Sequence, residues 1–279
     1  MKLGLGTVQF GLNYGISNSS GIISDNDIEK VFETISKNGI SYIDTAQAYG
    51  NAEKRIGRFD LTNYKVISKI NKSLKSNEIE KHFLTSLDNL GLNKLYGLLV
   101  HDFNHFKFDN SIYHEIKKLK NMGYLEKIGF SLYETNELNY LLKNKIEFDI
   151  LQIPYSIFDQ RFSDLLDTLK LNKVEIHARS IFLQGLVFLN PESLSNYFDP
   201  IKNHLKKFRE ETYKNGISIE SACLNFVCQD KRIDCALIGI NKFKELVNIL
   251  DSYDEKISTT VFKKFEIEDN NLLNPSKWK

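Results

Sequence analysis

The sequence predicts a parallel (β/α)8 barrel, and three observations support this fold class. Short apolar or β-branched runs alternate with longer amphipathic segments, and the pair recurs eight times along the chain. A strand followed by a helix is the unit from which parallel sheets are built. The length of 279 residues suits such a barrel, which commonly needs about 250. Charged side chains also stand at the ends of several strands, where barrel enzymes hold their catalytic groups.

The strands are expected where apolar runs follow a turn residue or a helix end. They occupy residues 3–8, 42–43, 65–70, 95–100, 127–130, 148–153, 174–178 and 234–238. Helices are expected where apolar residues recur at helical spacing. They occupy residues 25–38, 52–59, 77–90, 110–121, 135–144, 161–171, 201–213, 218–229, 242–250 and 257–265. Ser24 is a typical N-cap residue, and Gly39, Gly91 and Gly123 are typical helix ends.

A doubly wound open sheet has the same alternation and is the main alternative. It would place a glycine-rich phosphate-binding turn directly after its first strand. Here Gly4 and Gly6 lie inside the first strand, and Gly11 and Gly15 follow without G-x-G-x-x-G spacing. The barrel is therefore favoured. No stretch rich in Pro, Gly or Ser divides the chain, so one barrel domain over residues 1–279 is expected.

The composition limits the partners. Lys and Arg number 37 and Asp and Glu 36, so the net charge is +1 and neither nucleic acid nor an anionic membrane is expected. The three cysteines, Cys223, Cys228 and Cys235, lack the paired spacing of a metal site, so buried thiols and no metal are expected. The N-terminal residues have no long apolar run, which predicts a cytoplasmic protein. The oligomeric state is left open.

Four chemically active side chains follow three consecutive strands. Asp44 ends the second strand and Tyr49 lies in the loop beyond it, Lys69 lies at the end of the third, and His101 directly follows the fourth. Side chains alternate along a strand, so all four are expected at the mouth of the barrel. A phenol has a pKa near 10. We expect the ammonium to lower that pKa and the carboxylate to hold the ammonium, which makes a proton donor for a carbonyl oxygen.

Each of these residues also has a structural interpretation. A tyrosine after a strand usually packs, a strand-end aspartate usually caps the next helix, and a single histidine is more often structural than catalytic. Lys69 within an apolar strand is harder to explain in this way, because burying an unpaired ammonium costs several kcal/mol.

These residues resemble the aldo-keto reductase superfamily, whose members are NAD(P)H-dependent barrel enzymes. The likeness rests on IDTAQAYG, on Lys69 and His101, and on GLGTVQFG, GFSLYET, FDILQIPYS and ARSIFLQGL in the same order. It implies hydride transfer to an aldehyde or ketone, a small-molecule carbonyl substrate. The family's catalytic Asp, Tyr, Lys and His fall on Asp44, Tyr49, Lys69 and His101.

The resemblance also implies the cofactor contacts. Residues near the first strand approach the nicotinamide, two strand-end polar groups hold its carboxamide, the loop after the seventh strand embraces the pyrophosphate, and GINKFKELVN takes the adenosine end. The residues concerned are Gly6, Thr7, Ser131, Gln152, Arg179, Ser180, Leu183, Gly185, Gly239, Asn241, Lys242 and Asn248. Loops after strands seven and eight bind phosphate in barrels generally.

Two departures from the family pattern concern the cofactor. Arg179 stands where many members have an aromatic ring, so the nicotinamide would stack on a guanidinium plane. Asn241 replaces an Arg that often holds the 2′-phosphate, and Asn248-Ile249 replaces a Glu-Asn pair. Lys242 is then the nearest cation and favours NADPH, with NADH as the alternative.

The substrate is only coarsely indicated. A pocket rim is expected from loops after the first and fourth strands, and its residues are Phe10, Asn13, Tyr14, Asp102, Phe103 and His105. Such a rim suits a sugar or sugar derivative. Trp278 is expected to dock on the barrel, and no long C-terminal lid is expected. Two other functions stay open: a nucleotide-binding regulatory or scaffolding protein, and a Schiff-base aldolase with Lys69 as nucleophile.

Overall fold

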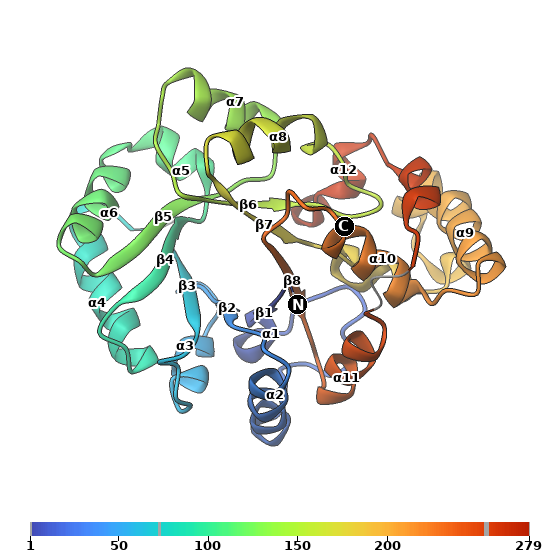
Figure 1. Ribbon diagram of the computed structural model, residues 1–279, viewed down its shortest axis with the longest axis horizontal. Coiled ribbons are helices and arrows are strands. Elements are labelled where there is room, and N and C mark those ends of the chain that lie inside the picture. The colour runs from blue at the N-terminus through green and yellow to red at the C-terminus, as the bar shows by residue number, and fades with distance from the viewer. Residues whose placement is uncertain (1, 72–73, 254–256, 279) are drawn as a thin grey trace.

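The predicted barrel is present. In a computed structural model that describes residues 2–71, 74–253 and 257–278, eight parallel strands close in sequence order, and β8 pairs with β1. Helices surround this barrel (Figure 1). The strands are β1 Leu3–Gly6, β2 Tyr42–Asp44, β3 Lys65–Ile70, β4 Leu95–Val100, β5 Leu125–Ser131, β6 Ile150–Pro154, β7 Glu175–Arg179 and β8 Cys235–Gly239.

The α-helices are α1 Val8–Gly11, α2 Asp25–Lys37, α3 Ala52–Ile56, α4 Ile79–Leu90, α5 Phe103–Phe108, α6 Ser111–Asn121, α7 Thr135–Lys143, α8 Ser163–Leu171, α9 Asp199–Lys214, α10 Ile219–Cys228, α11 Phe243–Asp251 and α12 Asn270–Leu273. Apart from the short helices α1, α5 and α12, which were not predicted, the α-helices fall on the predicted amphipathic segments. The predicted cap is formed, because Ser24 Oγ accepts the backbone N–H of Asp27 at 3.1 Å. Within the described ranges, no helix is long and apolar enough to span a bilayer.

Short helical segments account for most of the differences from the predicted elements. The first strand ends at Gly6 instead of Val8, because the chain turns there into α1. The helical turn α5 was not predicted, and Asp102 caps it by accepting the N–H groups of Asn104 and His105. The last expected helix, 257–265, is instead a 3-10 helix over Thr260–Phe265.

The barrel interior is layered. Ile67, Leu99 and Ile150 form a small apolar cluster across its middle, separate from the large core between barrel and helices. Lys69 lies toward the carboxyl-terminal side of this middle layer, because it follows Ile67 by two residues on β3, and Asp44 is the last residue of β2. The three cysteines are buried free thiols, as expected.

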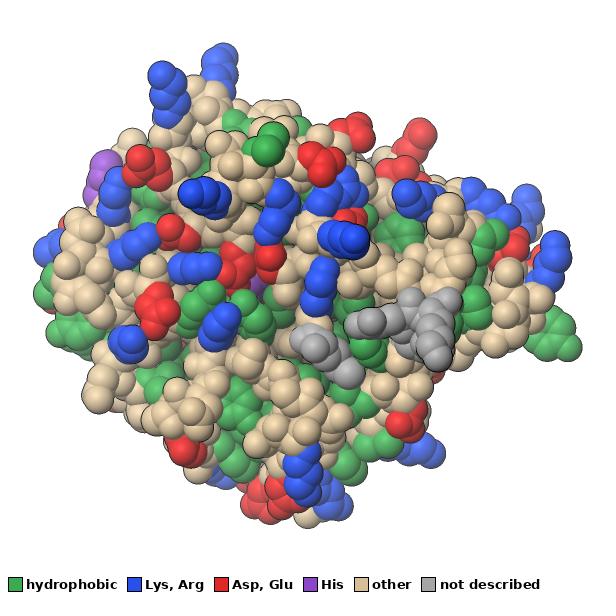
Figure 2. Space-filling model, in the orientation of Figure 1, with side chains coloured by type: hydrophobic (Ala, Val, Ile, Leu, Met, Phe, Trp, Pro, Cys, Tyr) green, Lys and Arg blue, Asp and Glu red, His purple; other side chains and the backbone are tan. Residues whose placement is uncertain are grey.

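The opposite, amino-terminal face is electrostatically mixed. Figure 2 shows Lys and Arg side chains interspersed with Asp and Glu over the face it presents. Two of the surface pairs are Lys94 with Glu126 at 2.9 Å and Lys117 with Glu147 at 3.0 Å. Among the described residues, this face therefore presents no single-sign patch of the kind that attracts a polyanion.

Candidate active site

The centre of the site is a buried ion pair beneath a phenol. Lys69 Nζ lies 2.5 Å from Asp44 Oδ2, and it also donates to the backbone oxygen of Thr45 at 3.1 Å. The oxygen of Tyr49 lies 3.5 Å from the same nitrogen. Lys69 is only 1% exposed, so the carboxylate is what makes burial of its charge tolerable. Strands β2 and β3 therefore bring three of the four predicted groups into direct contact.

The pKa of Tyr49 is shifted in the direction opposite to the sequence prediction. Burial raises this pKa well above its ordinary value, the Asp44 carboxylate raises it further, and the Arg179 guanidinium opposes the rise only in part. The predicted lowering by Lys69 does not prevail, because burial and the Asp44 carboxylate both act to raise the pKa of Tyr49. Burial in turn lowers the pKa of Lys69, and Asp44 opposes this. Tyr49 is therefore a protonated phenol at neutral pH.

Backbone packing fixes the position of the Tyr49 loop. Gly11 in α1 is pressed against this loop, and a Cβ there would lie 1.8 Å from the backbone oxygen of Tyr49. Gly50 has φ +57, and a Cβ there would lie 2.5 Å from the oxygen of Gly11. The glycines of GLGTVQFG and IDTAQAYG thus allow two loops to touch, which holds the phenol over the ion pair.

The fourth predicted group, His101, reaches the same mouth. Its ring meets the Tyr49 ring edge to face, with ring centroids 5.8 Å apart. It lines a cavity of about 1350 Å³ together with Asp44 and Tyr49. Three of the four residues that the sequence placed at strand ends, Asp44, Tyr49 and His101, therefore line one cavity, and the fourth, Lys69, is buried against Asp44 and Tyr49.

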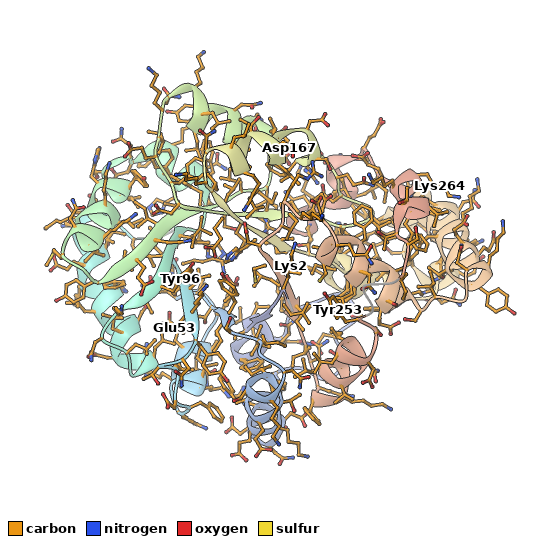
Figure 3. All side chains as sticks on the ribbon, in the orientation of Figure 1. Lys2, Glu53, Tyr96, Asp167, Tyr253 and Lys264 are labelled. Atoms are coloured by element: carbon orange, nitrogen blue, oxygen red, sulfur yellow. The ribbon has the colours of Figure 1, made fainter. Side chains whose placement is uncertain are left out.

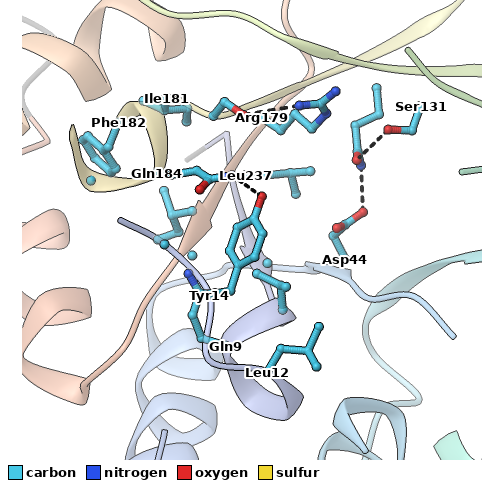
Figure 4. A pocket seen from close by; sticks show the side chains of 18 of the residues that line it. Gln9, Leu12, Tyr14, Asp44, Ser131, Arg179, Ile181, Phe182, Gln184 and Leu237 are labelled. Carbon is cyan, nitrogen blue, oxygen red and sulfur yellow. Dashed lines mark hydrogen bonds between the residues drawn. The ribbon is translucent and has the colours of Figure 1, made fainter. Parts of the chain in front are cut away.

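Two polar side chains extend the cluster across the barrel. Gln152 Nε2 donates to Asp44 Oδ1 at 2.7 Å, and Ser131 Oγ donates to Gln152 Oε1 at 3.5 Å (Figure 4). Both line the cavity. Thr7 holds Asp44 from behind, since its N–H and hydroxyl donate to the Asp44 backbone oxygen at 2.9 and 3.0 Å. Thr7 is fully buried and does not line the cavity. It therefore positions the backbone of Asp44 and is not placed to contact a cofactor directly.

Arg179 projects into the cavity from the end of β7. Its Nη2 donates to the backbone oxygen of Leu132 at 2.9 Å, and its Nη1 donates to Ser180 Oγ at 3.3 Å. The Tyr133 ring covers one face of the guanidinium, with the central carbon 3.9 Å from the ring centroid. Tyr133 was not singled out in the sequence, although it directly follows the strand-end segment GFSL. The plane of Arg179 is thus fixed by contacts on the protein side.

The loop after β7 is tightly folded along the cavity. Ser180, Leu183, Gln184 and Gly185 all have positive φ, between +44 and +87, which is unusual for residues with side chains. A Cβ at Gly185 would lie 1.8 Å from Ser17 Oγ, so the loops after β1 and β7 touch there. Leu183 is buried and points away from the cavity lining, whereas Ser180 and Gly185 line it.

Tyr14 spans the cavity between these two loops. Gln184 Nε2 donates to its oxygen at 2.5 Å, and Figure 4 shows the ring reaching from the β1 side toward Gln184. Burial raises the pKa of Tyr14 far above its ordinary value. Gln184 was not predicted from the sequence, because it is the loop fold that turns its side chain toward Tyr14.

The far end of the cavity is rich in acceptors. Gly239, Asn241 and Asn248 line it as predicted, while Lys242 is exposed and is not one of the lining residues that the structure describes. Within the described ranges, the buried oxygens Gln9 Oε1 and Asn241 Oδ1 have no hydrogen-bond partner. A cavity of this length, with glycines at Gly6, Gly185 and Gly239 and orphaned polar atoms, fits a dinucleotide.

The predicted substrate rim is partly correct. Tyr14, Asp102 and Phe103 line the cavity. Phe10 is instead a core residue, because it is completely buried. His105 is turned away, since its Nε2 lies 2.7 Å from the backbone oxygen of Leu74. Trp278 docks as expected, with its Nε1 donating to the Leu272 oxygen at 3.0 Å.

A phenol beside a buried lysine–carboxylate pair, at a large cavity on the carboxyl-terminal side of a (β/α)8 barrel, stands where barrel enzymes hold their active sites. The family model of the Aldo/keto reductase family matches residues 2–269, and the chain belongs to this family. It is therefore an oxidoreductase that acts on carbonyl groups, and its family uses nicotinamide cofactors.

Several solved aldo-keto reductases share the fold. One from Bacillus halodurans, in its holo form, is 16% identical, with 95% of this chain and 90% of that chain covered and a TM-score of 0.73. A thermostable aldo-keto reductase in complex with the inhibitor epalrestat is 20% identical over 95% of both chains, with a TM-score of 0.72. One from a Medee basin deep-sea metagenome library is 20% identical, covers 100% and 93%, and has a TM-score of 0.69. No curated protein matches the chain.

Proposed function

We propose that the enzyme reduces an aldehyde or ketone that carries hydroxyl groups, with Tyr49 as proton donor. The observation that carries this proposal is the position of Lys69 Nζ, 2.5 Å from Asp44 and 3.5 Å from the Tyr49 oxygen. The raised pKa of Tyr49 keeps the proton on the phenol until hydride transfer makes the carbonyl oxygen basic enough to accept it. The ammonium then stabilises the phenolate that forms as the proton leaves.

The proposed cofactor is a nicotinamide dinucleotide, which supplies the hydride when bound. Ser131 and Gln152 are suited to its carboxamide, since they offer a hydroxyl and a side-chain amide on the cavity wall. Arg179 offers a guanidinium plane already fixed by Leu132 and Tyr133. Ser180 and Gly185 border the middle of the cavity, where the pyrophosphate would lie.

The proposed role of His101 is to orient the substrate oxygen beside Tyr49. The two side chains are neighbours and line the same cavity, so a substrate carbonyl in that cavity can accept hydrogen bonds from both. The Schiff-base alternative is disfavoured, because Lys69 is 1% exposed and two of its donors are directed at Asp44 and Thr45. A carbonyl carbon would have to displace that pairing to reach the nitrogen.

The proposed substrate class follows from the polar groups around the opening. Asn71, Asp102 and Asn104 line the cavity beside His101, together with the aromatic ring of Phe103. Carboxylate and amide groups pair with hydroxyl groups, and an aromatic ring packs on the apolar face of a sugar. A small polyhydroxy carbonyl compound, such as a sugar or sugar derivative, is therefore the favoured substrate.

The test is oxidation of reduced nicotinamide cofactor against a panel of aldoses, ketoses, their derivatives and simple aldehydes. The Tyr49→Phe variant should lose activity by about 10²-fold or more, the scale of general acid catalysis. Tyr213→Phe is the matched control, because Tyr213 is 89% exposed on α9, and it should behave as wild type. Undiminished turnover in Tyr49→Phe would contradict the proposed mechanism. Preference for simple aldehydes over every sugar would contradict the substrate class.

A further inference from the structure

The end of the cavity remote from Tyr49 has a consistent chemical character. If the nicotinamide lies beside Tyr49, the adenosine half of the cofactor must extend past the loop after β7 toward α10 and α11. Two carboxylates line this end, Glu220 in the first turn of α10 and Glu245 in the first turn of α11. The groups offered to the adenosine ribose are therefore negatively charged acceptors.

Hydrogen bonds to Glu245 fix the orientation of the Asn241 side chain. The Glu245 carboxylate accepts the backbone N–H of Asn241 at 2.7 Å, and Asn241 Nδ2 lies 3.3 and 3.4 Å from its two oxygens. The amide donors of Asn241 are thus turned toward Glu245, and its Oδ1 is left buried without a partner among the described residues. The positive end of α11 is also already matched by this carboxylate. Asn241 therefore adds an acceptor to the cavity wall.

Gln9 adds a second unmatched acceptor nearby. Its side chain is 8% exposed and lines the cavity, and its Oε1 has no partner within the described ranges. It packs directly on Gly239, where a Cβ would lie 2.8 Å from Gln9 Nε2 and 2.9 Å from Oε1. A buried acceptor without a donor costs free energy. A ligand hydroxyl that donates here would remove that cost.

The lysines next to this end of the cavity in the sequence do not line it. Lys242 and Lys244 are exposed, and neither is among the described residues that line the cavity. Of the cavity's Lys and Arg residues in the described ranges, Arg179 lies beside the catalytic cluster at the end of β7, and Lys277 is on the C-terminal segment. That segment also contacts the loop after β5, where Asn270 Nδ2 donates to Glu134 at 3.1 Å.

We propose that the cavity binds NADH in preference to NADPH, an inference that rests on the function proposed above. A 2′-phosphate is a dianion that needs Arg or Lys donors, whereas a free ribose 2′-hydroxyl is a donor that pairs with a carboxylate. Glu220, Glu245 and the Asn241 oxygen match the hydroxyl and oppose the phosphate. This reverses the cofactor preference that Lys242 suggested in the sequence.

The test is equilibrium binding of NADH and of NADPH to the full chain, followed by the fluorescence of the reduced nicotinamide. We expect the wild-type Kd for NADH to be at least tenfold lower than for NADPH, or about 1.4 kcal/mol. Glu220→Arg should lower the Kd for NADPH about tenfold, because it places a cation beside the 2′-phosphate, and should raise the Kd for NADH, because the 2′-hydroxyl loses a carboxylate acceptor. Glu220→Gln should give a smaller shift in the same direction. Neither substitution removes the cap of α10, because Ser218 Oγ accepts the N–H of Ser221.

Lys242→Ala distinguishes NADPH preference, which the sequence suggested, from NADH preference, which we propose. Lys244→Ala is the matched exposed control. We expect neither change to alter the Kd for NADPH by more than about twofold, as for other exposed cations. Tighter binding of NADPH than NADH in the wild type, lost in Lys242→Ala alone, would overturn the inference and leave the reductase function intact. An unchanged Kd for NADPH in both Glu220 variants would overturn the role of that carboxylate. Failure of both nucleotides to bind would overturn the proposed function itself.

Discussion

The barrel interior holds two clusters of the same residue types, one at each end. At the carboxyl-terminal end, Lys69 pairs with Asp44 beside a tyrosine and a histidine. At the amino-terminal end, Lys127 pairs with Glu175, and this carboxylate also lies 2.6 Å from the Tyr96 oxygen and 2.7 Å from His177 Nε2. Each cluster thus contains a carboxylate, a lysine, a phenol and an imidazole, but only the first opens onto the large cavity.

The difference between the clusters lies in where each phenol directs its proton. Tyr96, labelled in Figure 3, donates its hydroxyl directly to the Glu175 carboxylate. The Tyr49 oxygen instead lies beside the Lys69 ammonium, which is itself a donor, and faces the cavity. The proton of Tyr96 is therefore committed to a structural bond, while that of Tyr49 is available to a substrate. Residue types alone do not separate the cluster that we propose to be catalytic from the structural one; the direction of their hydrogen bonds does.

The electrostatics follow the same division. Burial acts to raise the pKa of Glu175, but hydrogen bonds from His177, Lys127 and Tyr96 outweigh it and hold that pKa well below its usual range. Burial raises the pKa of Cys235, which faces the same end of the barrel. The Glu175 carboxylate is thus fully engaged by its three donors, although His177 Nδ1 is buried without a partner among the described residues. The amino-terminal cluster should contribute to stability and leave turnover unaffected.

The largest expected effect comes from exchanging each lysine for methionine. Lys69→Met should lower kcat by about 10²-fold or more, because the phenolate loses the cation that stabilises it. Lys127→Met should change kcat by no more than about twofold, because its charge lies on the far side of the apolar middle layer. Steady-state kinetics with the best substrate of the panel measure both, and circular dichroism verifies the fold. Equal losses of kcat in the two variants would contradict the separate roles assigned to the two lysines.

The amino-terminal carboxylate should matter for stability. Glu175→Gln removes the charge that three donors share, and we expect unfolding to become easier by about 3 kcal/mol. Guanidinium unfolding measures this, and kcat should remain unchanged. The control is Glu126→Gln, which breaks an exposed pair with Lys94 and should cost at most about 1 kcal/mol. A wild-type unfolding midpoint in Glu175→Gln would count against a structural role.

The stabilisation by Glu175 should depend on pH in a defined direction. Its folded-state pKa is depressed, so the contribution is fully present above the unfolded pKa of about 4.3 and is lost as the pH falls toward the folded value. The stability gap between wild type and Glu175→Gln should therefore be constant from pH 7 to about pH 5 and shrink below about pH 4. Guanidinium unfolding across this range measures it. A stability difference between wild type and Glu175→Gln that grows on acidification would contradict a depressed pKa of Glu175 in the folded state.

The smallest expected effect is that of the second phenol. Tyr96→Phe removes one hydrogen bond to Glu175 and should cost about 1.5 kcal/mol of stability, with kcat unchanged. Tyr49→Phe removes no bond to a carboxylate and should leave the unfolding free energy within about 0.5 kcal/mol of wild type. Thermal and chemical unfolding of both variants measure the contrast. A larger stability loss in Tyr49→Phe than in Tyr96→Phe would invert the proposed roles.

The barrel and its four catalytic candidates were readable from local pattern. The strands Lys65–Ile70 and Leu95–Val100 match their predicted bounds, because an apolar strand bounded by polar turns is a local signal. In a parallel barrel every strand end points to the same face, so Asp44, Lys69 and His101 needed no further information to be placed together. Their pairing depends only on neighbouring strands.

Other features depend on register and stagger around the whole barrel. Glu175 and Tyr96 come from β7 and β4 and are 79 residues apart, so nothing local marks them as partners. The pKa of Tyr49 was expected to fall and instead rises, because burial depends on how loops pack over the mouth. The contact between Gly11 and the Tyr49 loop is likewise a product of packing.

The sequence by itself determined the order of the strands, the family and the residues at the strand ends, because period and turn chemistry are local properties. Only the tertiary structure decided which cations face the cavity. Lys242 was the nearest cation along the chain, yet it is exposed and does not line the cavity, while Glu220 and Glu245 line it from α10 and α11. The direction of a side chain at the start of a helix is set by how that helix packs on the barrel, and no stretch of sequence carries that direction alone.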